Sequence, residues 1–233
     1  MKKRISALLI GILVAVCAAP SDSQRDALRF KEEYESLNGQ ENTSGIDYVD
    51  ISIPEENPII YADIDKLMEI IDSEGIIYFG FDECPWCRNA LPVLIEAFQE
   101  KEVEEIYYYD IKEIRDELIL NEEGIIEVIK EKSEDYQKIY DALYESLNVY
   151  EGLNDVTIKR LYAPSVFFIK NGEVVLMHES TVESQADPSV MMGDAQKQKL
   201  KDIYIQGLEK ISNTYCDIIA SASIFRNRCF FIY

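Results

Sequence analysis

The sequence predicts an α/β fold with a mixed β-sheet. Segments of strand pattern alternate with segments of helical periodicity, which is typical of strands joined by helices. Residues 75–81 form a continuous apolar run bounded by glycine, as expected of a strand buried on both faces. Asn171-Gly172 lies between two β-rich runs and predicts a hairpin, which adds an antiparallel part to the sheet.

The composition limits the classes of function. Of the 233 residues, 47% are apolar and 29% are charged, as in a folded protein with its own core. The net charge of −21 repels phosphate backbones, so we expect no nucleic-acid partner. We interpret the excess of carboxylates mainly as a solubility feature. It is compatible with a cationic partner but identifies none.

The first twenty residues have the pattern of an export signal. Three cations, Lys2, Lys3 and Arg4, precede an apolar run over residues 5–16 that is too short to span a bilayer but suits a signal-peptide core. We therefore expect residues 1–20 to be a signal peptide and the protein to be exported.

Two processing routes fit this signal. Cleavage after Ala18 satisfies a small-residue rule. Alternatively, residues 14–17 resemble a lipobox, in which Cys17 would be lipidated and become the mature N-terminus. Val16 departs from that pattern, because Gly, Ala or Ser is usual before the cysteine. The protein is then either secreted or a lipoprotein anchored at the cell surface, and both routes stay open.

Residues 21–45 form a polar stretch ahead of the domain. A short helix over Asp26–Leu37 fits the pattern, and Asn38-Gly39 would end it. Its apolar residues are too sparse to predict a strong core face, and Gly39–Gly45 has the composition of a tether. We therefore expect a polar N-terminal helix and tether over 21–45, a folded domain over 46–215 and a C-terminal tail over 216–233.

The first half of the domain predicts two strands around a helix. Apolar residues between Tyr48 and Ile53 indicate a first strand. Asp63 can cap a helix whose apolar residues recur every three or four positions. The buried strand 75–81 follows.

The next elements continue the alternation. A helix runs through Glu100, a strand covers Ile106–Ile111, and residues 112–160 are predicted to be predominantly helical from apolar spacings of three or four. The hairpin strands 165–169 and 173–177 come next. A last helix fits Asp194–Ser212.

The chemistry is expected at Cys84-Pro85-Trp86-Cys87, where the buried strand meets a helix. Backbone N–H groups and the dipole at a helix N-terminus stabilise a thiolate. Cys84 would be the exposed nucleophile, and Cys87, one turn later, would resolve the mixed disulfide to give a redox-active Cys84–Cys87 pair. Pro85 suits the first helical turn. Trp86 is either an exposed substrate contact or packs on the domain surface.

Two other uses of the cysteine pair are less favoured. A zinc site needs four ligands, and no second Cys-x-x-Cys pair exists. Cys216, Cys229 and His178 are the remaining candidates of the folded region, so we expect no metal and no organic cofactor. A purely structural disulfide does not explain why Cys84 begins a helix.

These features together resemble the thioredoxin superfamily over Tyr48–Ser212. The match includes Pro92, which resembles the family's helix-kinking proline, and Pro164, which resembles its cis-proline. The resemblance implies a thioredoxin fold with a helical insertion before the cis-proline strand. It also implies that Pro164 faces the cysteines and that the backbone of Ala163 binds an extended substrate segment.

The sequence departs from that family in three ways. The 77 residues from Cys87 to Pro164 are longer than in a minimal thioredoxin, and resemble the insertion of periplasmic disulfide oxidases. Tyr78 replaces the family's buried acid, and Ile106 takes the place of its lysine partner. The Pro-Trp dipeptide is most similar to the Pro-Tyr of glutaredoxins, so the direction of electron flow stays open.

Acidic neighbours and the lone histidine add two further expectations. Asp82 and Glu83 are expected to raise the Cys84 pKa and partly oppose the helix dipole. His178, the only histidine, receives no role.

The chain also resembles exported thioredoxin-like proteins of Gram-positive bacteria, including bacteriocin-maturation disulfide isomerases and accessory proteins. This implies an extracytoplasmic thiol–disulfide oxidoreductase that acts on protein thiols and disulfides, as a monomer and with a lipid anchor as its only membrane contact. The alternative is a non-catalytic accessory or binding protein with the same fold. In the tail, Cys216 and Cys229 can pair in an oxidising compartment, or the tail is a poorly ordered extension.

Overall fold

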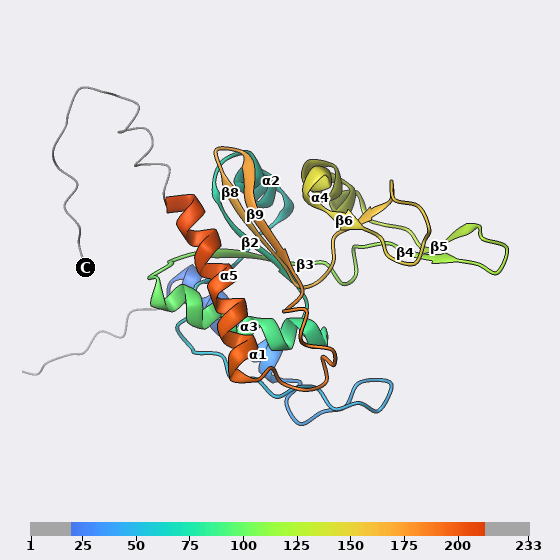
Figure 1. Ribbon diagram of the computed structural model, residues 1–233. Helices are drawn as coiled ribbons and strands as arrows, with labels where there is room; N and C mark the ends of the chain where they lie inside the picture. The colour runs from blue at the N-terminus through green and yellow to red at the C-terminus, as the bar shows by residue number, and fades with distance from the viewer. Residues whose placement is uncertain (1–19, 213–233) are drawn as a thin grey trace, which may run out of the picture.

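A computed structural model describes residues 20–212, which form a central five-stranded sheet with helices on both faces (Figure 1). The strand order is β1-β3-β2-β8-β9. The parallel strands are β1 (Ile59–Tyr61), β3 (Ile106–Asp110) and β2 (Gly75–Gly80), and the antiparallel ones are β8 (Ser165–Lys170) and β9 (Glu173–Glu179). The predicted α/β class with a mixed sheet is confirmed, and this arrangement is that of a thioredoxin fold.

The alternation of side chains along β2 divides the core into two layers. Ile76 and Tyr78 point to the face covered by α1 (Asp22–Glu35), α3 (Pro85–Glu100) and α5 (Asp194–Ser212). Ile77 and Phe79 point to the opposite face, which α2 (Ile64–Asp72) and α4 (Glu134–Leu143) cover. Because both faces are buried, the strand is apolar throughout, as the sequence indicated.

The predicted hairpin and three predicted helices are present. Asn171 and Gly172 both have positive φ angles, 51° and 75°, and connect β8 to β9. The Asp63 carboxylate caps α2 by accepting the Lys66 N–H at 2.8 Å. Helices α3 and α5 have the predicted extents.

The prediction of a peripheral N-terminal helix is wrong. The helix α1 begins four residues earlier than expected, where Ser21 forms a capping box with Gln24. Its Phe30 and Tyr34 are fully buried against the sheet. Although few, these two aromatics fill a large volume, so α1 belongs to the core.

The first strand lies later than predicted. Residues 48–53 alternate between buried and exposed positions but form no strand, and the edge strand is β1. The backbone of this segment bonds to side chains of the α1 region instead. Asn38 exchanges two hydrogen bonds with Ile51, at 2.8 and 3.0 Å, and Glu35 accepts the Ile53 N–H.

The prediction of a helical insert over 112–160 is also wrong. The segment contains a hairpin of β4 (Glu117–Leu120) and β5 (Ile126–Lys130), then α4, a single 3₁₀ turn at Tyr144–Ser146, and the short strands β6 (Asn148–Val149) and β7 (Lys159–Arg160). The Asn121 side chain accepts the N–H groups of Glu123 and Ile125, and Gly124 has a φ of 77°. This turn favours a hairpin over a helix.

Several predictions fall on residues outside the described range. They concern the signal, Cys17, and the pairing of Cys216 with Cys229. Within residues 20–212, no helix combines the length and apolar character needed to cross a bilayer.

Candidate active site

Cys84 is the N-cap residue of α3, and Pro85 is the first helical residue. The Cys84 sulfur accepts the backbone N–H of Cys87 at 3.2 Å. It therefore takes the position that a serine or aspartate oxygen occupies in most helix caps. Both cysteines are free thiols in this structure.

The loop before β8 lies against this cap. The Ala163–Pro164 peptide bond is cis, as the resemblance implied. The Cys84 thiol donates to the Ala163 carbonyl oxygen at 3.4 Å. The structure thus brings Cys84, Cys87, Ala163 and Pro164 together from segments about eighty residues apart.

The two thiols are more buried than the sequence indicated. Cys84 is 4% exposed and Cys87 is fully buried, so the expectation of an exposed Cys84 is wrong, although Cys84 is the more accessible residue of the pair. Pro85 is exposed beside it. Trp86 is half-buried and packs on the core, which favours the packing role over a freely exposed one.

The pKa values of the two thiols are shifted in opposite directions. Burial opposes ionisation of Cys84, but hydrogen bonds from the Cys87 thiol and from the N–H groups of Cys87 and Trp86, with the charge of Arg115, lower its pKa below the usual value. Burial and the neighbouring Cys84 sulfur raise the pKa of Cys87 well above it. Cys84 is therefore the thiol that ionises more readily, and Cys87 holds its proton.

Asp82 and Glu83 are not among the main influences on the pKa of Cys84, which is lowered overall. Glu83 forms an ion pair with Lys112 at 2.7 Å. Burial raises the pKa of Asp82, which reduces its negative charge at low pH. The cation that lowers the pKa of Cys84 is Arg115. Its guanidinium lies 4.9 Å from the centre of the Phe81 ring.

Tyr78 occupies the space behind Cys87. It is fully buried, and its hydroxyl opposes the rise in the pKa of the Cys87 thiol. Across the sheet Tyr78 pairs with Tyr108, and the two rings stack at 5.5 Å. Ile106 instead pairs with Ile59, so its predicted place opposite Tyr78 is wrong. The sequence located the strand that contains Ile106, but the register of that strand depends on its pairing with β1 and β2.

Sequence reasoning missed Arg88. Its side chain is fully buried and donates to four oxygens, those of Val49, Tyr34, Asp82 and Asn38, at 2.7–3.2 Å. Three are backbone carbonyls and none is a carboxylate. Arg88 therefore fastens α1 and the 48–53 segment to the start of α3. A charged residue directly after the cysteine pair, within an apolar helix, was the available signal.

A pocket of about 500 Å³ opens beside Trp86. It lies between the start of α3 and the segment that joins β9 to α5. His178 lines it, with Nε2 2.9 Å from the Thr181 carbonyl oxygen, and burial lowers the pKa of the imidazole. Two buried atoms of the lining residues, Thr181 Oγ1 and Gln185 Oε1, have no hydrogen-bond partner among the described residues.

Within the described range, no group of three or more His, Cys, Asp or Glu side chains is arranged to hold a metal ion. The site offers sulfur chemistry from two thiols of unequal acidity, beside the backbone carbonyl of Ala163.

Comparisons with known proteins find one distant structural likeness. No protein-family model matches the chain, and no curated protein matches its sequence. One solved structure that matches is described as "A putative oxidoreductase with a thioredoxin fold". It is 16% identical, the alignment covers 53% of this chain and 83% of that chain, and the TM-score is 0.33.

Proposed function

We propose that this protein is a thiol–disulfide oxidoreductase that acts on protein cysteines through Cys84 and Cys87. The observation that carries this proposal is the position of Cys84, whose sulfur caps α3 while its thiol faces the carbonyl of Ala163. A substrate segment bound along Ala163–Pro164 would present its sulfur to Cys84. The pocket beside Trp86 would accept a neighbouring side chain.

The reaction is an exchange of disulfides. The Cys84 thiolate attacks one sulfur of a substrate disulfide, which releases the other as a thiolate and leaves a mixed disulfide. Cys87 then loses its proton and attacks the Cys84 sulfur. The substrate leaves with two electrons more, and Cys84–Cys87 becomes a disulfide. The same steps in reverse oxidise a substrate dithiol.

Export is part of the proposal. The cationic and apolar pattern of residues 1–20 supports an extracytoplasmic location, with Cys17 as the candidate lipid anchor. The resemblance to exported thioredoxin-like proteins of Gram-positive bacteria supports the same location. Expression of the full chain in such a host would test it. If the original chain is attached to the membrane and the Cys17→Ala chain is not, Cys17 is lipidated. If the original chain and the Cys17→Ala chain are both secreted, the signal is removed by ordinary cleavage.

The rival is a non-catalytic accessory protein, which the 4% exposure of Cys84 favours. A trapping experiment separates the two. The Cys87→Ala chain should accumulate mixed disulfides with proteins through Cys84, and the Cys84→Ala chain should not. If neither variant forms adducts under mild oxidation, the accessory function stands and the oxidoreductase function is wrong.

A further inference from the structure

The strands β4 and β5 form a two-stranded arm, residues 117–130, that is separate from the central sheet. The arm projects from the body of the molecule (Figure 1). An isolated pair of strands has marginal stability in water because it buries little apolar surface.

Large aliphatic side chains lie on both faces of the arm. Leu118 pairs with Val128 and Ile119 pairs with Glu127, so successive aliphatics alternate between the two faces. Four of them are exposed large hydrophobics, namely Ile119, Ile125, Val128 and Ile129, with exposed fractions of 42–56%. Such an apolar strand is a template for pairing with another chain.

The two outer edges of the arm differ. On β4, the Tyr150 hydroxyl accepts the Leu118 N–H at 3.4 Å and donates to the Leu118 carbonyl at 3.3 Å, so this edge is occupied. On β5, no strand of the described chain pairs with the outer edge. The edge of β5 is therefore the one open to a further strand.

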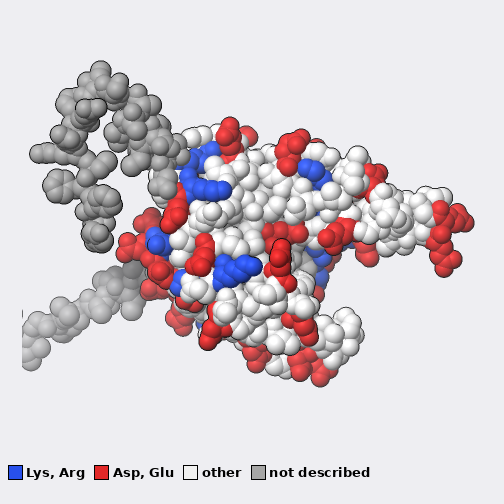
Figure 2. Space-filling model, in the orientation of Figure 1, with Lys and Arg blue, Asp and Glu red and all other residues white. Residues whose placement is uncertain are grey.

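The charge of the arm selects against self-pairing. The arm and the residue that follows it (117–131) contain five exposed glutamates and one lysine, which is paired with Glu113, for a net charge of −4. None of the five glutamates (117, 122, 123, 127, 131) forms an ion pair with another residue of 20–212. On the face shown in Figure 2, acidic residues gather at the tip of the arm. A second arm would bring like charges together, whereas a cationic strand would neutralise them.

The root of the arm lies next to the candidate active site. Lys112 pairs with Glu83, two residues from the start of α3, and Arg115 lies on the ring of Phe81. A polypeptide held by the arm would therefore be tethered close to Cys84.

We propose that the outer edge of β5 is a docking site for a cationic, strand-forming segment of a separate protein. Backbone hydrogen bonds to β5 would supply the pairing, as in other cases of strand addition. Lys or Arg side chains of the partner would face the glutamates, and its apolar side chains would cover Val128.

The test uses the full chain with both Cys84→Ser and Cys87→Ser, so that binding is measured without any redox reaction. The probe is a short labelled peptide in which Lys alternates with Val, and its affinity is measured by fluorescence anisotropy. Amide exchange at Ile126 and Val128 should slow when the probe binds. A peptide with Glu in place of Lys should not bind, nor should a Lys peptide carrying a central Pro.

Two charge variants complete the test. Glutamine at the arm glutamates 117, 122, 123 and 127 should weaken probe binding about tenfold, because each exposed ion pair contributes modestly. The matched control places glutamine at four exposed body glutamates, Glu55, Glu56, Glu102 and Glu104, and should retain most of the affinity.

Three results would overturn the proposal. The first is an equal loss of probe affinity in the arm variant and the body variant. The second is probe binding without slower amide exchange in β5, and the third is concentration-dependent self-association through the arm. Normal trapping by the Cys87→Ala chain with no peptide binding would remove the docking site alone and leave the oxidoreductase function intact.

Discussion

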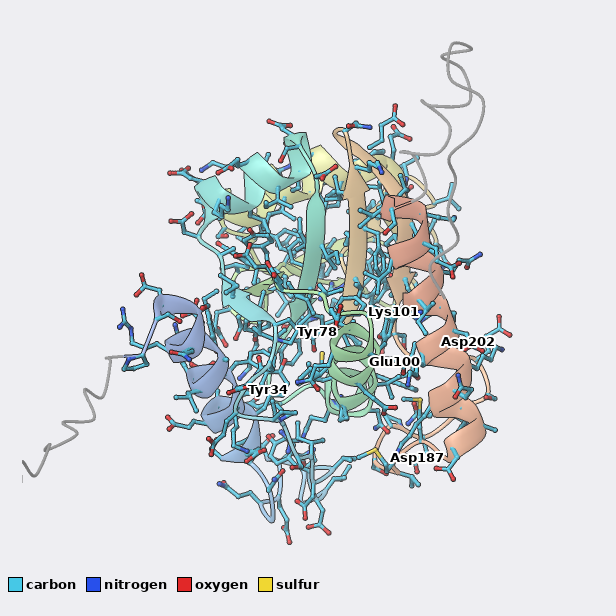
Figure 3. All side chains as sticks on the ribbon, turned by 90° about the vertical axis from the view of Figure 1, so that its left-hand side faces the viewer. Tyr34, Tyr78, Glu100, Lys101, Asp187 and Asp202 are labelled. Carbon is cyan, nitrogen blue, oxygen red and sulfur yellow. The ribbon has the colours of Figure 1, made fainter. Side chains whose placement is uncertain are left out.

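The Tyr34 hydroxyl of α1 lies 3.3 Å from the Tyr78 hydroxyl of β2, and both side chains are fully buried. Figure 3 shows the two tyrosines between α1 and the sheet. Tyr78 also opposes the rise in the pKa of Cys87, so a helix near the start of the described chain contributes to the environment of the second cysteine. Burial raises the pKa of both tyrosines, so the pair is neutral and leaves no uncompensated charge there.

Tyr78→Phe should slow the resolving step. The Tyr78 hydroxyl opposes the rise in the pKa of Cys87, so without it this thiol would ionise less and attack the mixed disulfide several-fold more slowly. Stopped-flow decay of a glutathione mixed disulfide at Cys84 measures the rate. The control is Tyr136→Phe, an equally buried tyrosine on the opposite layer. Unchanged resolution in Tyr78→Phe would show that the hydroxyl plays no part.

Alkylation of Cys84 should persist to lower pH than that of an ordinary thiol. The pKa of Cys84 is lowered in the folded protein. Cys84 should therefore still be ionised at a pH just below about 8.5, where an ordinary cysteine has become protonated. Cys87, whose pKa is raised, should stay unreactive at neutral pH. Iodoacetamide labelling with peptide mapping, against N-acetylcysteine as reference, measures both. A midpoint for Cys84 at or above the reference would contradict the assigned nucleophile.

Arg88→Met should destabilise the domain by about 3 kcal/mol or more. The change leaves buried carbonyls of three segments without a donor, and hydrogen bonds to a charged group are among the stronger ones. Urea unfolding measures the loss. The control is Arg25→Met, whose exposed pairing with Asp22 should contribute less than about 1 kcal/mol. Equal effects of the two changes would show that Arg88 is not an anchor.

Gly207→Ala should destabilise the protein by about 1–3 kcal/mol although alanine favours helices. A Cβ atom at this position would lie 2.5 Å from the ring of Phe168. The helix α5 approaches β8 closely because residue 207 has no side chain. Gln206→Ala, at the exposed neighbouring position, is the control and should change stability little. A higher thermal unfolding midpoint for Gly207→Ala would mean that the Phe168 ring can move away from the new Cβ atom without loss of stability.

Much of the fold could be predicted from the sequence because its main elements carry strong local signals. The buried strand β2, the capped helix α2 and the Asn171-Gly172 turn are each encoded within a few residues. The insert could not be predicted in the same way. Its apolar residues fit helical spacing, and the outcome depended on one turn at Asn121 and Gly124.

The cysteine pair could be located from the sequence, but its surroundings could not. Register places Tyr108, rather than Ile106, opposite Tyr78. Long-range packing brings Tyr34 and Arg88 together behind the cap of α3. Such contacts join segments more than forty residues apart, and no local pattern in either segment specifies them.

The proposed function requires that Cys84 and Cys87 exchange two electrons as a pair. Equilibration of the full chain in glutathione buffers of graded potential, followed by acid quenching, alkylation and peptide mapping, tests it most directly. We expect one two-electron transition in which both thiols disappear together into a Cys84–Cys87 disulfide, and its loss in Cys84→Ser. A midpoint near about −270 mV would indicate a reductase and one near about −120 mV an oxidase. Thiols that stay fully alkylated, or fully oxidised, across the whole range would contradict the claim.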